Sequence, residues 1–107
     1  MGGRYSVAFV TCPKGAASRI AKEVVAKRAA ACVSIISGVS STYLWKGKVE
    51  NASECMLVMK TRAELLPKLE NAVKKAHPYN VPEIIAFRIS RGSKPYLDWI
   101  GKETRTL

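Results

Sequence analysis

Three residues with metal-ligating side chains stand out in the chain: Cys12, His77 and Glu83. His77 is the only histidine, Pro78 restricts the backbone after it, and Glu83 follows shortly. A histidine with a cysteine and a carboxylate is a ligand set that suits copper or zinc. A lone histidine in a loop is, however, more often structural or solvated, and the sequence does not show that Cys12 meets His77. Both interpretations stay open.

The sequence contains no recognisable set of catalytic residues. No residues have the pattern of a nucleophile with its base, and no two carboxylates are paired in the way that general acid and base catalysis requires. We therefore expect a protein that is not an enzyme.

Lys14 lies where an anion could bind. It falls in a short loop between an expected strand and the N-terminus of an expected helix, where backbone amides can hold an anion with a lysine assisting. The loop lacks the glycine pattern of a phosphate loop. An ordinary solvated lysine is the simpler interpretation, and anion binding at Lys14 is the alternative to it.

The elements that must position these residues are organised around a long hairpin. Residues 30–45 alternate apolar with small polar side chains, as a half-buried strand does. Ser37-Gly38 in the middle predicts a bulge, and Lys46-Gly47 predicts the turn. The return strand begins at Lys48, is expected to be interrupted at residues 51–53, and continues through Met59.

This hairpin is too long for its own domain. An arm of about 14 residues spans ~45 Å at roughly 3.3 Å per residue. A compact chain of this length is only about 35 Å across. The overhanging end carries Tyr43, Leu44 and Trp45, large apolar groups that one small domain leaves uncovered. Exposed apolar tips of this kind mark interfaces, so the sequence predicts an oligomer with these residues in its interface.

The segments on either side of the hairpin predict two strands and two helices. Residues 5–11 form a short apolar strand, and the chain after Pro13 has helical spacing with Ala17, Ile20, Ala21, Val24 and Arg28 on one face. After the hairpin, Thr61-Arg62-Ala63-Glu64 resembles a capping box. We expect a short turn there and the main helix from near Pro67, with Leu66, Leu69, Val73 and Ala76 as its buried stripe.

The second helix must stop before His77-Pro78, because the residue before a proline avoids the α region. A long last strand then opens at Val81-Pro82-Glu83, and residues 95–100 predict a short C-terminal helix. The order β-α-β-β-α-β predicts an α+β ferredoxin-like sandwich with a long hairpin between its second and third strands. Residues 1–107 form one domain.

Composition narrows the partners and the compartment. The formal net charge is +10, but the basic residues are scattered and the aromatic signature of a βαββαβ RNA binder is missing, so we expect no nucleic-acid partner. No apolar run is long enough to span a membrane. Three cysteines without a Cys-x-x-Cys spacing suit a reducing, cytoplasmic compartment. Cys32 and Cys55 are expected in the core, and Cys12 at a strand end where its thiol could meet solvent.

Several stretches together resemble the CutA family of divalent-cation tolerance proteins. They are Thr-Cys-Pro at 11–13, Ala-Ala-Cys-Val-Ser-Ile-Ile-Ser-Gly-Val-Ser-Ser-Thr-Tyr-Leu-Trp-Lys-Gly-Lys-Val at 30–49, Met-Lys-Thr at 59–61, His-Pro-Tyr-Asn-Val-Pro-Glu-Ile-Ile-Ala at 77–86 and Tyr-Leu-Asp-Trp-Ile at 96–100. The resemblance covers nearly the whole chain. It implies a ferredoxin-like fold similar to the PII signalling proteins, assembled as a trimer through the long hairpins.

The resemblance also implies a link to copper or another divalent cation, with Cys12 and His77 as candidate ligands and Glu83 as a third. Three positions depart from the family pattern: Asn80 where an acidic residue is common, Lys14-Gly15 in a loop that is often acidic, and Ala76 where some members carry a second histidine. These departures leave an alternative open, a PII-like trimeric scaffold or sensor for a small anionic ligand or a protein partner.

Overall fold

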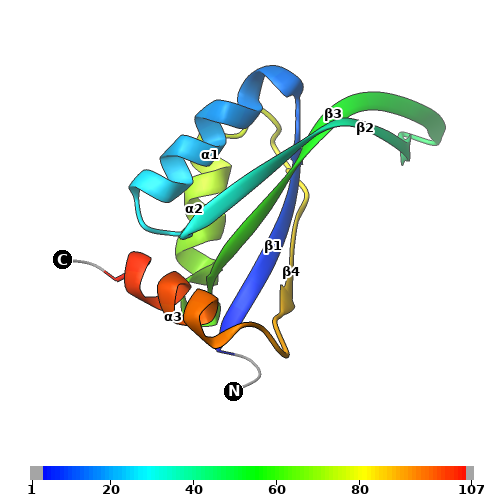
Figure 1. The fold of residues 1–107 in the computed structure, drawn as a ribbon. Helices are drawn as coiled ribbons and strands as arrows, with labels where there is room; N and C mark the ends of the chain where they lie inside the picture. Colours follow the sequence, from blue (N-terminus) through cyan, green and yellow to red (C-terminus); the bar gives the residue numbers. More distant parts are fainter. Residues whose placement is uncertain (1–3, 106–107) are drawn as a thin grey trace.

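A computed structural model describes residues 4–105 of the chain. Its strands are β1 (Tyr5–Cys12), β2 (Cys32–Trp45), β3 (Lys48–Arg62) and β4 (Ile84–Arg88), and its helices are α1 (Ala17–Ala26), α2 (Leu66–Ala76) and α3 (Lys94–Glu103). Single 3-10 turns, Lys14–Ala16 and Ala63–Leu65, precede α1 and α2. The strands pair in the order β2-β3-β1-β4, with every neighbouring pair antiparallel. The predicted α+β ferredoxin-like architecture is confirmed (Figure 1).

The core lies between the sheet and the two helices α1 and α2. Alternate residues of β1 and β3 face these helices, so that Val10, Leu57 and Met59 are fully buried against them. The helices contribute Ile20 and Leu69, among others, to the same cluster. Burying this apolar surface is the main force that holds the layers together.

The predicted helix faces are largely correct. Ala17, Ile20 and Val24 of α1 and Leu69 and Val73 of α2 are buried, as expected. The other residues of the two predicted buried faces are only partly buried. Arg28 is the clear error, because α1 ends at Ala26 and Arg28 follows it with a left-handed φ of 57°.

Helix α2 begins as predicted but without the predicted cap. A 3-10 turn comes first, and Pro67 then occupies the first turn of the helix, where its fixed φ fits. The capping box is wrong, because the hydroxyl of Thr61 donates instead to the carbonyl of Ala29 at 2.6 Å. The helix ends at Ala76, and His77 is extended with ψ of 136°, as the following proline requires.

The hairpin of β2 and β3 is continuous from Cys32↔Lys60 to Trp45↔Lys48. Its register shifts between Ile36 and Val39, which confirms the predicted bulge, and Gly38 there has a φ of 75°. Lys46 and Gly47 both have positive φ, the geometry of a two-residue hairpin turn. The predicted interruption at residues 51–53 is wrong, because these residues pair with residues 40–42 across the hairpin.

The hairpin makes the molecule long and narrow. The described chain measures 44 × 26 × 22 Å, and Figure 1 shows the end of the hairpin extending beyond the layer of helices. At this end Tyr43, Leu44 and Trp45 are 45%, 73% and 61% exposed. The predicted overhang with an uncovered apolar tip is confirmed.

Two elements near the C-terminus differ in length from the prediction. Strand β4 starts at Ile84 rather than at Val81, because Pro82 has no N–H for a ladder and the pairing with β1 begins only at Val10↔Ile84. Helix α3 runs from Lys94 to Glu103 and is longer than the predicted 95–100, with Pro95 in its first turn as expected. Among the described residues, none of the helices is long and apolar enough to cross a membrane.

Candidate functional site

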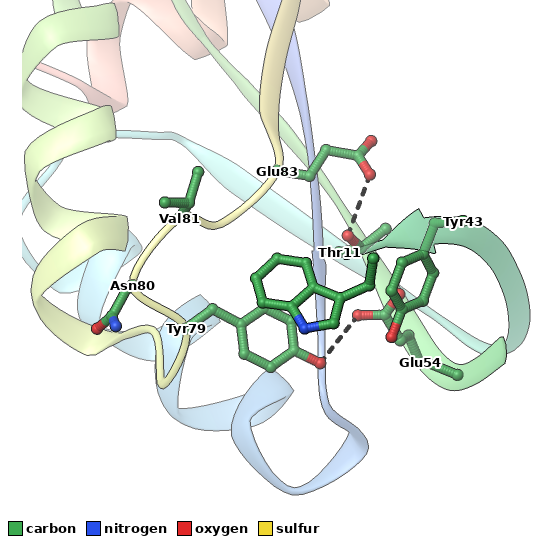
Figure 2. Close-up of a pocket in the computed structure, with 9 residues that line it drawn as sticks. Thr11, Tyr43, Glu54, Tyr79, Asn80, Val81 and Glu83 are labelled. Carbon is green, nitrogen blue, oxygen red and sulfur yellow. Dashed lines mark hydrogen bonds between the residues drawn. The ribbon is translucent and has the colours of Figure 1, made fainter. Parts of the chain in front are cut away.

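A pocket of about 510 Å³ lies between the hairpin and the segment that leads from α2 to β4. Its walls come from the end of β1, from both strands of the hairpin and from residues 79–83 (Figure 2). The lining residues are Thr11, Tyr43, Trp45, Ala52, Glu54, Tyr79, Asn80, Val81 and Glu83. Four distant segments therefore meet here, and three of the residues predicted from sequence, Glu83, Tyr43 and Trp45, are among them.

His77 is not part of the pocket lining, but its hydrogen bonds hold the loop after α2 against the end of β1. The Nε2 of His77 lies 2.7 Å from the carbonyl oxygen of Thr11, and the backbone N–H of Tyr79 donates to Nδ1 at 3.1 Å. A carbonyl only accepts, so Nε2 carries the proton and the ring is the neutral Nε2–H tautomer. The side chain is 7% exposed, and both of its nitrogens are used inside the protein.

The position of His77 follows from where the sheet ends. The N–H of Ile89 bonds to the carbonyl of Tyr5, which shows that the odd residues of β1 turn their backbone groups toward β4. The ladder between β1 and β4 stops at Val10↔Ile84, one residue short of Thr11. The carbonyl of Thr11 is thus left without a strand partner, and His77 supplies the missing hydrogen bond.

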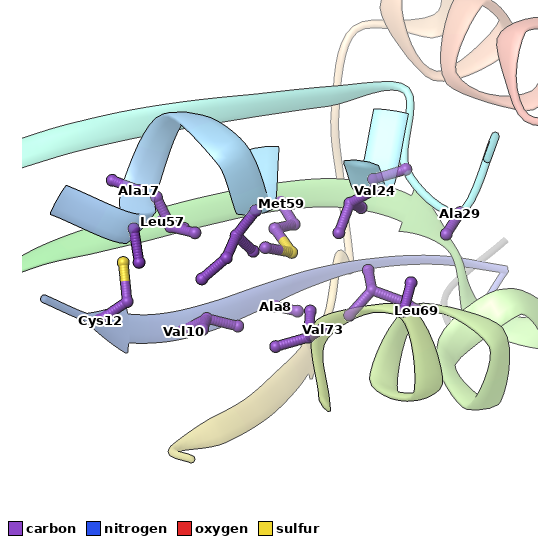
Figure 3. Close-up of a cluster of buried hydrophobic side chains, with 14 of the residues drawn as sticks. Ala8, Val10, Cys12, Ala17, Val24, Ala29, Leu57, Met59, Leu69 and Val73 are labelled. Carbon is purple, nitrogen blue, oxygen red and sulfur yellow. The ribbon is translucent and has the colours of Figure 1, made fainter. Parts of the chain in front are cut away.

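Cys12 faces the other way, into the core. Figure 3 shows it near Leu57 and Ala17 at one end of the buried cluster. The side chain is fully buried, so the prediction that its thiol meets solvent is wrong. Burial, with the neighbouring Cys55 and Glu54 adding to it, raises the pKa of Cys12 from its ordinary 9.0 to about 11. Such a thiol keeps its proton and is a poor nucleophile.

Cys12 and Cys55 are direct neighbours across β1 and β3. The N–H of Ala63 bonds to the carbonyl of Arg4, so the even residues of β1 form the hydrogen-bonded pairs with β3, and Cys12 with Cys55 is one of them. In such pairs the Cβ atoms lie at about 5.5 Å, farther apart than the ~3.8 Å of a disulfide. Both thiols are free, as this spacing requires.

The predicted ligands do not come together as a metal site. Among residues 4–105 there is no group of three or more His, Cys, Asp or Glu side chains that could hold a metal ion. The thiol of Cys12 is in the core, both nitrogens of His77 are bonded, and only Glu83 faces the pocket, where it accepts a hydrogen bond from the hydroxyl of Thr11 at 3.2 Å. In this arrangement the three residues do not fit a divalent ion.

The sequence interpretation missed Glu54, the most buried acid of the pocket. Its side chain is only 7% exposed and accepts a hydrogen bond from the hydroxyl of Tyr79 at 3.3 Å, as Figure 2 shows. Burial and the adjacent Glu54 carboxylate raise the pKa of Tyr79. In the sequence Glu54 is a single acidic residue before the apolar run of β3. An ordinary solvated strand residue gives the same pattern, so the sequence did not single it out.

The apolar tip presents two different faces. Tyr43 and Trp45 lie on one face of β2 and line the pocket, whereas Leu44 lies on the opposite face, because side chains alternate along a strand. Leu44 pairs across the hairpin with Val49, and the two are 73% and 69% exposed. The tip therefore carries an apolar patch that the pocket does not use.

Lys14 lies in the 3-10 turn before α1 and is exposed. Helix α1 has no side-chain cap at its N-terminus, where Ala16 precedes it. Anion binding at this end of α1 stays a prediction.

The raised pKa of Cys12 predicts a pH-dependent stability. Between pH 9.0 and about 11 the unfolded thiol ionises while the folded one keeps its proton, so the free energy of unfolding falls as the pH rises through this window. We expect a shallower fall in Cys12→Ala, measured by urea unfolding at fixed chain concentration. Cys32→Ala, which changes a partly exposed thiol, is the control. Equal pH slopes for Cys12→Ala and the unmodified protein would contradict the assignment.

Comparison with known proteins gives a consistent result. Residues 6–103 match the family model described as CutA1 divalent ion tolerance protein. The chain is 45% identical over 106 residues to Protein CutA of Mus musculus, covering 98% of this chain and 60% of the mouse protein. It is 44% identical to the divalent-cation tolerance protein CutA of Thermus thermophilus, covering 92% and 96%. The crystal structure of CutA from Xylella fastidiosa superposes with a TM-score of 0.93, at 38% identity and with 95% and 99% of the two chains covered.

Proposed function

The chain belongs to the CutA1 divalent ion tolerance family, and on this basis we propose that it is a homotrimeric, non-enzymatic protein of the cytoplasm that takes part in tolerance of divalent cations. The chain spans about 60% of the length of the mammalian relatives it matches. Copper or another divalent ion is the proposed cation. Three free cysteines support a reducing compartment.

The observation that supports assembly is the uncovered apolar surface of the hairpin, and the number of three chains rests on the family. Tyr43, Leu44 and Trp45 stand at the end of an arm that overhangs the domain, and none of them is less than 45% exposed. A stable monomer rarely leaves so many large apolar groups together in water. We propose that these three residues take part in the contact between copies, with Leu44, which does not line the pocket, at its centre.

A second apolar surface supports assembly. Ala8, Val10 and Cys12 face the helices, so Val7 and Phe9 of β1 face away from them, together with their partners in β4, Phe87 and Ile85. Phe87 is 52% and Ile85 46% exposed, and the rings of Phe9 and Phe87 meet edge to face with centroids 5.4 Å apart. This exposed apolar face of the sheet is therefore also suited to contact with another chain.

Metal binding by Cys12, His77 and Glu83 would require a rearrangement. The imidazole of His77 must release the Thr11 carbonyl or the Tyr79 N–H before it can bind an ion. Both residues 77–83 and the end of β1 would have to be repositioned, because the thiol of Cys12 lies in the core. We propose that any binding by this set is coupled to such a movement.

Native mass spectrometry of the purified protein, with and without Cu(II), tests both parts of the proposal. We expect a trimer that takes up copper in a fixed ratio to chains, with uptake reduced in His77→Gln. Glu70→Gln, on the exposed face of α2, is the matched control and should bind normally. A trimer that stays bare would contradict the metal role and leave the assembly standing, whereas a monomer would contradict the assembly.

The alternative of a small anionic ligand is not favoured at the pocket. Glu54 and Glu83 are the charged residues of its lining, and both are acids. A carboxylate wall repels an anion. An anion-sensing role would have to use another surface.

A further inference from the structure

The pocket is acidic although the chain as a whole is basic. Its lining holds Glu54 and Glu83 and no lysine or arginine, in a protein with a formal net charge of +10. Within residues 4–105, neither carboxylate takes part in an ion pair. The pocket therefore selects for positive charge, in contrast to most of the surface.

Glu54 in particular lacks a compensating charge. It is only 7% exposed, and in the described part of the chain the hydroxyl of Tyr79 is the one side-chain donor that reaches it, at 3.3 Å. Taking a carboxylate out of water without a counter-charge is unfavourable, and one long hydrogen bond from a neutral hydroxyl offsets little of that. A cation in the pocket would supply what the protein does not.

The rest of the wall is aromatic. Tyr43 and Trp45 come from the hairpin and Tyr79 from the loop after α2, and Ala52 and Val81 add apolar surface. Aromatic faces attract a cation through the ring quadrupole, most strongly when its charge is spread over alkyl groups and it sheds water easily. The volume of about 510 Å³ lies within the range of small-molecule sites.

These features favour an organic cation over a metal ion. A hard divalent ion needs six or more oxygen ligands, and a transition metal needs several nitrogen or sulfur ligands. The described residues contain no three-residue ligand group. We propose that this pocket binds a small organic ammonium ion, with its charge compensated by Glu54 and Glu83 and its alkyl groups held by Tyr43, Trp45 and Tyr79. This inference goes beyond the divalent-cation role and does not depend on it.

Tetramethylammonium is the simplest probe, and tert-butanol is its uncharged counterpart of similar size. We expect isothermal titration calorimetry on the assembled protein to show one tetramethylammonium per chain, bound at least about tenfold more tightly than tert-butanol at equal ionic strength. The fluorescence of Trp45 should change in parallel. Trp99 lies on α3, away from the pocket, so Trp99→Phe isolates the Trp45 signal.

Variants separate the charge from the rings. Glu54→Gln keeps the shape and removes the charge, and should weaken tetramethylammonium binding by about tenfold or more. Tyr79→Phe keeps the ring and should retain binding, whereas Tyr79→Leu should lose it. Glu70→Gln on α2 should bind as the unmodified protein does.

The unmodified protein decides the matter even where a variant misfolds, because the two probes are similar in size and differ in charge, with the hydroxyl of tert-butanol as the one further difference. Equal binding of tetramethylammonium and tert-butanol, or no binding of either, would overturn the proposal. A protein that binds Cu(II) but not tetramethylammonium would retain the divalent-cation role and lose this one. The reverse result would support the ammonium site and contradict the metal role.

Discussion

Replacing Trp45 by aspartate should convert the assembled protein into single chains. Trp45 is 61% exposed in one chain, at the end of the overhanging hairpin. Association would take an aspartate out of water there at a cost of several kcal/mol for each chain, of which the neighbouring Lys46 and the cross-strand Lys48 offset only a part. Light scattering during size-exclusion chromatography should then report the 11.7 kDa of one chain.

Two further variants show whether charge at the tip is the cause. Trp45→Phe keeps an apolar ring and should leave the oligomer intact. Asn51→Asp adds the same charge to the exposed part of the hairpin, where the side-chain oxygen of Asn51 already accepts the hydroxyl of Thr42 at 2.7 Å. It should also assemble. An intact oligomer in Trp45→Asp would remove the hairpin tip from the interface.

Replacing His77 by leucine should destabilise the protein even when no metal is present. The change deprives the carbonyl of Thr11 and the N–H of Tyr79 of their partners. An unsatisfied buried polar group costs about 1–3 kcal/mol, so we expect a loss near 3 kcal/mol in urea unfolding at fixed chain concentration. His77→Gln retains a donor and an acceptor in its amide and should lose about half as much.

This prediction separates a structural histidine from a pure ligand. A residue whose only role is to bind an ion can be replaced without cost to the metal-free protein. Metal-free stability that is unchanged in His77→Leu would therefore show that the bonds to Thr11 and Tyr79 contribute nothing. A loss of stability that appears in His77→Leu only when metal is present would likewise indicate that His77 acts as a ligand and not as a structural residue.

The parts of the fold that were predictable are those in which local chemistry decides. Gly38 marks the bulge and Lys46-Gly47 the turn because few residues adopt a positive φ. Pro78 stops α2, and Pro67 starts it, through fixed backbone geometry. The length of the hairpin came from simple alternation, and the overhang followed from length alone. In each case a few neighbouring residues contain all the information.

The pocket could not be predicted because its contacts join distant segments. Tyr79 and Glu54 are 25 residues apart, and Thr11 and Glu83 are 72 apart. Glu54 is buried beside Tyr79, a residue of the loop after α2, and this contact cannot be read from the pattern of β3. The expectation that the thiol of Cys12 could meet solvent failed for a similar reason. A strand end is usually exposed, but here α1 starts close by and covers it.

The last strand was predicted to open at Val81, but in the structure it begins only at Ile84. Ile85 and Phe87 do alternate, but the chain before Ile84 belongs to the pocket wall rather than to the ladder. Pro82 cannot donate to the ladder, and the hydrogen bond between His77 and the carbonyl of Thr11 takes the place of the next strand pair. His77, the only histidine in the sequence, thus bonds to the backbone of Thr11 in the adjacent strand.

If the pocket binds a ligand and the tip joins two chains, the alternation of Tyr43, Leu44 and Trp45 links ligand binding to association. Two of the side chains line the pocket, and the third lies on the opposite, exposed face of the same strand. A molecule held by Tyr43 and Trp45 also fixes the backbone that presents Leu44. Coupling of this kind is reciprocal: the factor by which the ligand changes the association constant of the chains equals the factor by which association changes the affinity for the ligand. Association of the chains would then respond to occupancy of the pocket, with the hairpin as the shared element.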